Sequence, residues 1–189
     1  MGNNNKILND SGVIPSLVQS KRQIDLYNLD LDAQAILVAS RLMAAGAMLG
    51  QASEIHFSRF GLSTGRYRLL ADLEDNEGEE LPSQLAEHLG VTRATVTGLI
   101  DTLERDGLVA RRLSSEDGRQ KSVILTEAGA KKLREMAPEH FARLEAMVGL
   151  LNIEERSVFL DLLDRVTQGI SALTGELGSK PKGNISNHQ

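Results

Sequence analysis

The stretch from residue 92 to residue 97 places hydroxyl and guanidinium groups at the predicted start of a helix. Arg93 can donate two parallel hydrogen bonds to guanine N7 and O6, and threonine methyl groups can contact the methyl group of thymine. The free N–H groups of a helix N-terminus also favour phosphate. These properties predict contact with DNA. The residues expected to make it are Thr92, Arg93, Thr95 and Thr97, with Ser83 on the preceding helix.

A second group of basic side chains follows in residues 108–125, within a chain whose net charge is −5. The Asp117-Gly118 pair, between β-branched segments at 108–113 and 120–125, predicts a β-hairpin. An arginine at its tip would suit the negative potential of a narrow minor groove, whereas an isolated hairpin is more often only a solvated surface. Beside a DNA-reading helix we expect DNA contacts from Arg111, Arg112, Arg119 and Lys121, with Asp117 shaping the turn.

The element that must position these groups is a helix-turn-helix. A helix is predicted over residues 81–89, and Gly90 follows where a positive φ is needed. Thr92 caps a second helix that runs to residue 106. Its apolar stripe has the i, i+3, i+4, i+7 spacing of a buried helix face: Val96, Leu99, Ile100 and Leu103. In such motifs the N-terminal half of the second helix enters the major groove.

Residues 61–126 are therefore assigned to a winged helix-turn-helix domain. Within it, Ser63 or Thr64 can cap a helix that runs to residue 74, and residues 75–80 are interpreted as an acidic turn. A longer helix precedes it in residues 31–60, with Asp30 as its cap. That helix is apolar on most sides, so it must be covered on most sides. We expect it to lie between its own domain and a second copy of the chain.

Two further helices are predicted in residues 127–173, the C-terminal dimerisation region. Apolar residues there alternate at spacings of three and four, which suits helix pairing. Pro138 should kink or split the first helix, and Asn152 with Glu155 resembles a capping box at the start of the second. The fold class expected is mainly α with a small β-hairpin wing.

The two ends of the chain are polar. Residues 1–30 are interpreted either as a flexible arm or as a short helix that packs on a partner subunit. Residues 174–189 contain no core-forming pattern, so we expect a disordered tail.

Composition excludes several kinds of chemistry. The chain has no cysteine, which rules out disulfides, thiolate metal sites and a cysteine nucleophile. There is no glycine-rich phosphate loop or nucleophile motif, so we expect neither an enzyme nor a cofactor. The four histidines lie far apart in the sequence, and we therefore expect no metal site: His56, His88, His140 and His188.

No segment is predicted to enter a membrane. Residues 33–50 are the most apolar stretch, but Arg41 interrupts them, and the uncharged run at 42–53 is shorter than the ~20 residues that span a bilayer. The N-terminus has no apolar run typical of a secretory signal. We expect a cytoplasmic protein.

Residues 62–130 resemble the MarR family of bacterial winged-helix transcriptional regulators, and the order of helices extends the resemblance over about 31–173. The matching residues are Leu85-Ala86, Leu89-Gly90-Val91, Thr95-Val96-Thr97, Leu99-Ile100, Leu103-Glu104, Gly107-Leu108-Val109, Arg111-Arg112, Asp117-Gly118-Arg119 and Leu125-Thr126 with Gly129. The resemblance implies a homodimer that binds a pseudo-palindromic operator on double-stranded DNA, usually as a repressor. It also implies a small aromatic or anionic effector.

On the same resemblance, the effector would bind in a crevice beside the winged domain. The candidates are Met48, His56, Arg59, Tyr67 and Arg68, each of which can equally well pack or form a surface pair. The cysteine of the family's peroxide sensors and the tryptophan of its urate-responsive branch are both absent. Two alternatives stay open: a winged-helix protein-interaction module, and a DNA-binding regulator without a ligand switch.

Overall fold

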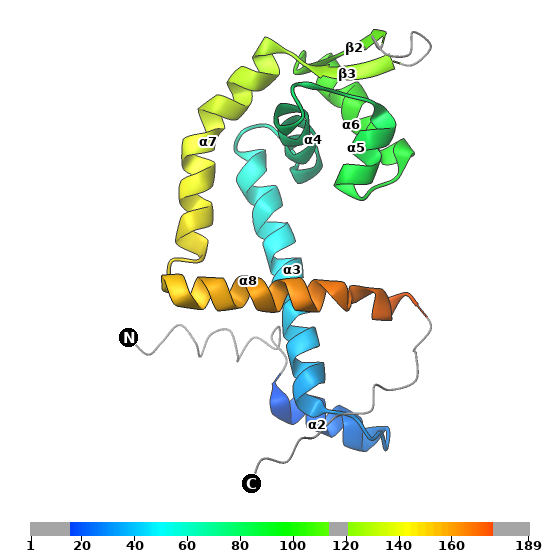
Figure 1. The fold of residues 1–189 in the computed structure, drawn as a ribbon, viewed down its shortest axis with the longest axis vertical. Coiled ribbons are helices and arrows are strands. Elements are labelled where there is room, and N and C mark those ends of the chain that lie inside the picture. Colours follow the sequence, from blue (N-terminus) through cyan, green and yellow to red (C-terminus); the bar gives the residue numbers. More distant parts are fainter. Residues whose placement is uncertain (1–15, 114–120, 176–189) are drawn as a thin grey trace. The chain divides into compact units, whose positions relative to one another are not determined.

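A computed structural model of the chain describes residues 16–113 and 121–175, and it confirms the mainly helical fold with a small antiparallel wing (Figure 1). The chain divides into two compact units, residues 1–135 and 136–189. The first holds α2 (Leu17–Leu26), α3 (Ala33–Ser58), α4 (Thr64–Asp75), β1 (Glu79–Glu80), α5 (Pro82–Leu89), α6 (Arg93–Arg105), β2 (Val109–Leu113) and β3 (Lys121–Leu125). The next helix, α7 (Glu127–Met147), ends in the second unit, which also holds α8 (Ile153–Gln168) and a 3₁₀ turn at Ile170–Leu173.

The N-terminal region contains a short helix, α2, as one of the two interpretations predicted. Ser16 caps it, because the N–H of Gln19 donates to Ser16 Oγ at 3.3 Å and the N–H of Ser16 donates to Gln19 Oε1 at 2.8 Å. The helix buries Ser20 and Ile24 and contacts α3 of the same chain. Its packing on a partner subunit stays a prediction.

The long helix α3 differs from its prediction in two respects. Asp32, and not Asp30, caps it, because the carboxylate of Asp32 is the one that reaches the N–H of Gln34, at 2.8 Å. Among the described residues only Phe57 of this helix is buried, so most of its apolar surface has no cover from the described part of its own domain. By length and composition alone α3 would also be able to cross a membrane, despite Arg41.

The wing is a three-stranded antiparallel sheet in the order β1-β3-β2. Val109 lies opposite Leu125, and Leu113 lies opposite Lys121. The third strand, β1, corrects the expectation of a plain acidic turn over residues 75–80. Positive φ angles at Glu77 and Gly78 turn the chain so that β1 can pair with β3. The wing tip with Asp117 and Arg119 lies outside the described residues.

The core of the winged domain is built by α4, α5, α6 and the sheet. Buried apolar side chains from these elements include Leu69, Leu70, Leu73, Leu85, Val96, Ile100, Leu103 and Val123. The predicted stripe of α6 is confirmed, apart from Leu99, which is half-buried. Gly90 adopts φ +67° between α5 and α6, and Thr92 caps α6 by accepting a hydrogen bond from the N–H of Thr95 at 3.1 Å.

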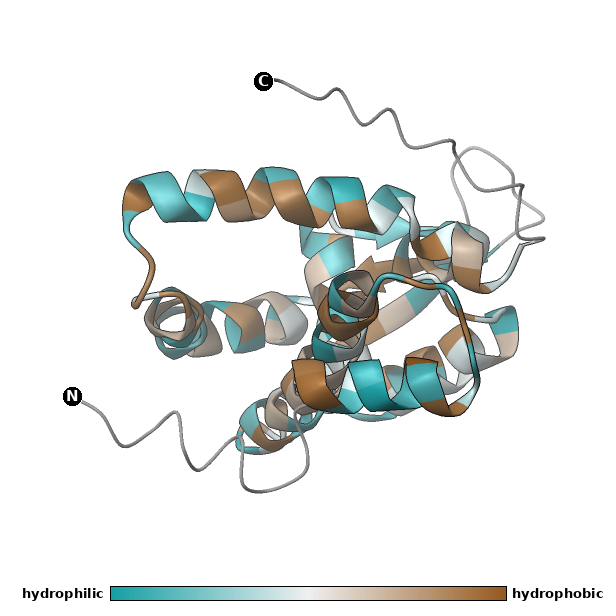
Figure 2. Cartoon of the chain, turned by 90° about the horizontal axis from the view of Figure 1, so that it is seen from below, coloured by the Kyte–Doolittle hydropathy of each residue, from teal (hydrophilic) through white to brown (hydrophobic). Residues whose placement is uncertain are grey.

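In the C-terminal region, α7 is not split at Pro138 but continues to Met147. One missing N–H removes a single hydrogen bond, and a helix of 21 residues keeps the others. The capping box of α8 is confirmed, since the N–H of Glu155 donates to Asn152 Oδ1 at 2.9 Å and the N–H of Asn152 donates to Glu155 Oε2 at 2.8 Å. Hydrophobic residues recur along α8, and none of its residues is buried (Figure 2).

Candidate nucleic-acid interface

The N-terminal half of α6 presents an exposed row of polar side chains. Thr92, Arg93, Thr95 and Thr97 are all exposed, whereas Val96 between them is buried. The hydroxyls of Thr92 and Thr95 lie 2.9 Å apart, and Thr97 Oγ1 donates to the Arg93 carbonyl at 2.9 Å. These bonds orient the threonines around the guanidinium-bearing residue. Ser83 is exposed on α5.

Arg111 on β2 is engaged with α6. Its guanidinium forms ion pairs with Asp101 and Glu104, and its backbone N–H donates to Glu104 Oε1 at 3.2 Å. These interactions, with the Asp101 hydrogen bond foremost, raise the pKa of Arg111 above its ordinary value. The side chain therefore fastens the wing to α6, and any contact with DNA phosphate would compete with these carboxylates.

Arg112 is paired in a different way. It forms an ion pair with Glu79 on β1, whose carboxylate also accepts a hydrogen bond from Ser122 Oγ. The Ser122 hydrogen bond and Arg112 lower the pKa of Glu79. Lys121, at the start of β3, is exposed. DNA contacts by these wing residues stay predictions, as do those of Asp117 and Arg119, which the described ranges do not include.

A further arginine, whose role no pattern in the sequence indicates, supports α6. Arg66 on α4 forms an ion pair with Asp106, the residue that follows α6, and it donates to the Gly61 carbonyl at 3.2 Å. Gly65, one residue earlier, leaves room for Leu99: a Cβ there would lie 3.3 Å from Leu99 Cδ2. Thus α4 supports α6 through packing at Gly65 and through an ion pair with the residue that follows α6.

Two of the five predicted effector residues gather around Phe57. The ring of Tyr67 stacks on Phe57 with centroids 4.1 Å apart and an interplanar angle of 18°. His56 meets Phe57 edge-on at 5.0 Å and Phe60 at 5.4 Å. Burial, followed by the charges of Asp75 and Glu74, raises the pKa of Tyr67.

The other three effector candidates lie at other positions along α3 and α4. Arg68 Nη2 donates to the Leu89 carbonyl at 3.0 Å, which satisfies the C-terminal end of α5. Met48 is exposed on α3 more than two turns before His56, and Arg59 is the exposed C-cap residue of that helix. The sequence could not distinguish these roles, because each depends on which element the side chain meets.

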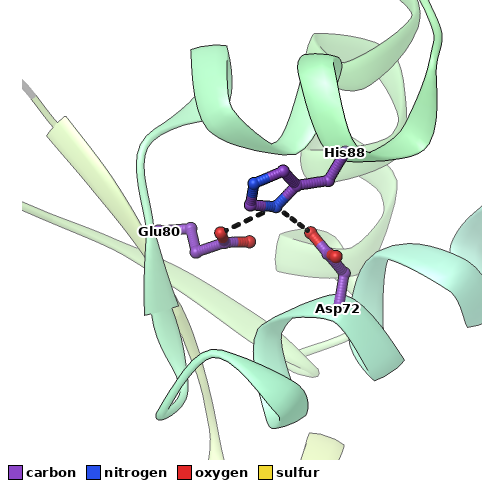
Figure 3. A group of neighbouring side chains, drawn as sticks. All are labelled: Asp72, Glu80 and His88. Atoms are coloured by element: carbon purple, nitrogen blue, oxygen red, sulfur yellow. Dashed lines mark hydrogen bonds and ion pairs between the residues drawn. The ribbon is translucent and has the colours of Figure 1, made fainter.

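Folding brings three polar side chains together in a way that the spacing of the histidines in the sequence does not indicate. His88 on α5 lies beside two carboxylates, those of Asp72 on α4 and Glu80 on β1 (Figure 3). Burial, followed by the neighbouring Asp72, raises the pKa of Glu80. The expectation of no metal site rests on the separation of the histidines in the sequence and stays a prediction, whereas folding brings two carboxylates to one of those histidines. His188 lies outside the described residues.

Comparison with known proteins identifies the family of this domain. The family model that describes the MarR family matches residues 62–121. The HTH-type transcriptional repressor YetL of Bacillus subtilis (strain 168) is 34% identical over 143 residues, which cover 75% of this chain and 86% of YetL.

Solved structures show the same fold. Sco3205 of Streptomyces coelicolor, a MarR family transcriptional regulator solved in complex with DNA, is 25% identical, with a TM-score of 0.68 over 78% of this chain and 94% of that one. The PcaV transcriptional regulator of the same organism, solved with its natural ligand, is 23% identical, with a TM-score of 0.59 over 69% and 94% of the two chains.

Proposed function

This chain belongs to the MarR family of DNA-binding transcriptional regulators, and on that premise we propose that it is a cytoplasmic, homodimeric repressor. It would bind a pseudo-palindromic operator and leave it when a small aromatic or anionic ligand binds. The observation that carries the DNA-binding part is the exposed N-terminal half of α6, with Arg93 among oriented threonines beside an antiparallel wing. This is the face that a helix-turn-helix inserts into the major groove.

Uncovered apolar helices support the dimer. On α3, Val38 is 53% exposed and Met43 is 65% exposed, and on α8 Leu160 is 62% exposed. Faces of this kind are usually covered by another chain. In a dimer the two α6 helices would lie about 34 Å apart, so that they meet successive major grooves on one face of the duplex. An apolar α3 covered by a partner also accounts for its composition without a membrane.

The aromatic group of His56, Phe57 and Tyr67 supports a ligand with a ring. Aromatic side chains favour stacked or edge-on partners, and Arg59, at the end of the same helix, can meet a carboxylate. A ligand would release DNA only by the difference between its affinities for the two dimer conformations.

The DNA-binding proposal is tested by fluorescence anisotropy with duplexes from the region upstream of the chain's own gene. Replacing Arg93 by alanine should weaken binding of the preferred duplex about tenfold or more, and it should relax base preference, because bidentate contacts discriminate between bases. The control is Arg105→Ala, which removes an exposed arginine at the opposite end of α6. Equal affinities for wild type and Arg93→Ala would contradict the assignment of this reading surface.

Arg119→Ala should weaken binding to all duplexes alike, because a wing contact of this kind depends mainly on backbone charge. Affinity of the wild type should also fall steeply with salt as counterions are released. Absence of binding to any upstream duplex would instead favour the protein-interaction module.

The ligand is tested separately, by melting the protein with a series of aromatic carboxylates. A ligand that binds the folded state raises the melting temperature, and it should also weaken DNA binding. Tyr67→Leu should lose this response and keep DNA affinity. If DNA binds tightly and no carboxylate changes the melting temperature or the DNA affinity, the chain is a regulator that does not respond to such a ligand.

A further inference from the structure

Three consecutive elements of the winged domain each contribute one polar side chain to a single cluster: Asp72 from α4, Glu80 from β1 and His88 from α5 (Figure 3). His88 Nδ1 lies 3.1 Å from Glu80 Oε1 and 3.3 Å from Asp72 Oδ2. Ligand atoms bound at 2.0–2.2 Å to one tetrahedral ion lie about 3.3–3.5 Å from each other. The distance from His88 to Asp72 is therefore already at the spacing of a coordination site, and the distance from His88 to Glu80 is slightly shorter than that spacing.

The burial of Glu80 points to a ligand in addition to this geometry. Its side chain is only 5% exposed, and its second carboxylate oxygen, Oε2, is buried without a hydrogen-bond partner. A buried carboxylate oxygen normally has a donor or a cation beside it. Here a second carboxylate, that of Asp72, lies nearby. Among the ion pairs of the described residues, His88 is the one basic side chain that pairs with either carboxylate.

We propose that Asp72, Glu80 and His88 bind one divalent transition-metal ion, with Zn²⁺ as the first candidate. The imidazole nitrogen favours such ions over Mg²⁺ and Ca²⁺, which prefer sites made of oxygen alone. Three protein ligands leave a fourth position for water. His88 is 42% exposed, so the cluster is open to solvent on that side and an ion can enter.

The bound ion would connect the first helix of the helix-turn-helix to its supports. It would join α5 to α4 and β1, to which His88 is already linked by a hydrogen bond with Asp72 and an ion pair with Glu80. Because the site would not exist in the unfolded chain, binding should stabilise the winged domain. This inference does not depend on the operator or on the effector.

The proposal is tested on the full chain after treatment with EDTA and removal of the chelator. Zn²⁺ is titrated against a chromophoric chelator, which reports affinity and stoichiometry together. We expect one ion per chain, and an affinity at least tenfold weaker in Glu80→Gln and in His88→Gln. The matched control is Glu87→Gln, which removes the same charge from an exposed position next to His88 on α5 and should bind as the wild type does.

Melting curves provide a second readout. Zn²⁺ should raise the melting temperature of the wild type and of Glu87→Gln, and it should not raise that of Glu80→Gln. In EDTA, Glu80→Gln should melt at or above the wild-type temperature, because the substitution removes one of two neighbouring negative charges. Lost Zn²⁺ affinity in that variant would then not be a result of unfolding.

Two results would overturn the proposal. One is the absence of saturable binding at one ion per chain. The other is equal Zn²⁺ affinity in the wild type, Glu80→Gln and His88→Gln. Competition by millimolar Mg²⁺ as strong as that by micromolar Mn²⁺ or Co²⁺ would overturn the assignment to transition metals.

Discussion

The winged domain and helix α8 use the same kind of apolar periodicity, yet they differ in what covers it. Leu69, Leu70 and Leu73 on α4 have no exposed surface, whereas Val158 and Leu160 on α8 are 59% and 62% exposed. The first set is enclosed by helices and strands of its own domain. The second has no such cover among the residues that the structure describes.

An apolar stripe on a helix predicts that this face is buried, but it does not indicate whether the same chain or another chain buries it. In the winged domain the covering helices and strands belong to the same domain, and tight turns at Gly90 and Gly107, where φ is positive, connect some of them. For α8, no residue of the helix is buried among residues 16–113 and 121–175. Its apolar depression is lined by Leu151, Val158, Phe159 and Leu162 with Glu154 and Glu155. We therefore expect the two regions to respond differently to substitution.

The largest effect is expected in the core. Leu73→Ala should lower the free energy of unfolding by about 2–5 kcal/mol, because it removes a fully enclosed side chain and leaves a cavity. Urea denaturation measures this change. Leu113→Ala is the control, since that leucine is 62% exposed at the end of β2 and its loss should cost less than about 1 kcal/mol. Similar losses for both variants would remove the proposed contrast.

A comparable effect on association, with little effect on folding, is expected on α8. Replacing Phe159 and Leu162 together by glutamate should weaken the dimer by at least about 2 kcal/mol, because it buries charge in an apolar interface. Sedimentation would then detect monomers with normal helical circular dichroism. Gln168→Glu adds a charge to the last residue of the same helix and should leave the dimer intact. A stable dimer of the double variant would show that α8 does not form the interface.

Substitutions at two glycines should change the free energy of unfolding by an intermediate amount. A Cβ at Gly129 would overlap the Leu108 carbonyl oxygen and lie 2.7 Å from Leu125 Cδ1, so Gly129→Ala should destabilise the winged domain by about 1–3 kcal/mol. A Cβ at Gly46 on α3 would meet nothing within 4 Å, and Gly46→Ala should stabilise the helix by up to about 1 kcal/mol. Thermal unfolding compares the two. Destabilisation by Gly46→Ala would indicate that a partner chain packs closely against α3.

The smallest effect is expected from the ion pairs of the wing. Arg111→Gln removes contacts with Asp101 and Glu104, but the three side chains are 27%, 51% and 38% exposed, so solvent screens the charges. We expect a loss of less than about 1 kcal/mol in unfolding experiments, decreasing further in 1 M salt. Arg112→Gln, at a more exposed pair, should cost still less. A loss above 2 kcal/mol for Arg111 would show that the wing depends on this pair.

Much of the helix-turn-helix could be predicted from residues that are close together in the sequence. Gly90 ends one helix, Thr92 caps the next, and Val96 begins the buried stripe, because each of these roles depends on backbone conformation within a few residues. The capping box at Asn152 was predictable for the same reason. The sequence by itself therefore determined where the helices of the winged domain begin and end, and which face of α6 is exposed.

Only the tertiary structure decided what the polar side chains contact. Glu79 and Glu80 form a strand because they pair with β3, which lies more than forty residues later in the sequence. No local sequence pattern predicts that pairing. Arg111 pairs with α6, and Arg68 satisfies the end of α5, and the sequence alone indicates neither of these contacts. Asp72 and His88 meet because three elements converge. Charged side chains are long and tolerate many partners, so their contacts depend on which elements the hydrophobic core brings together.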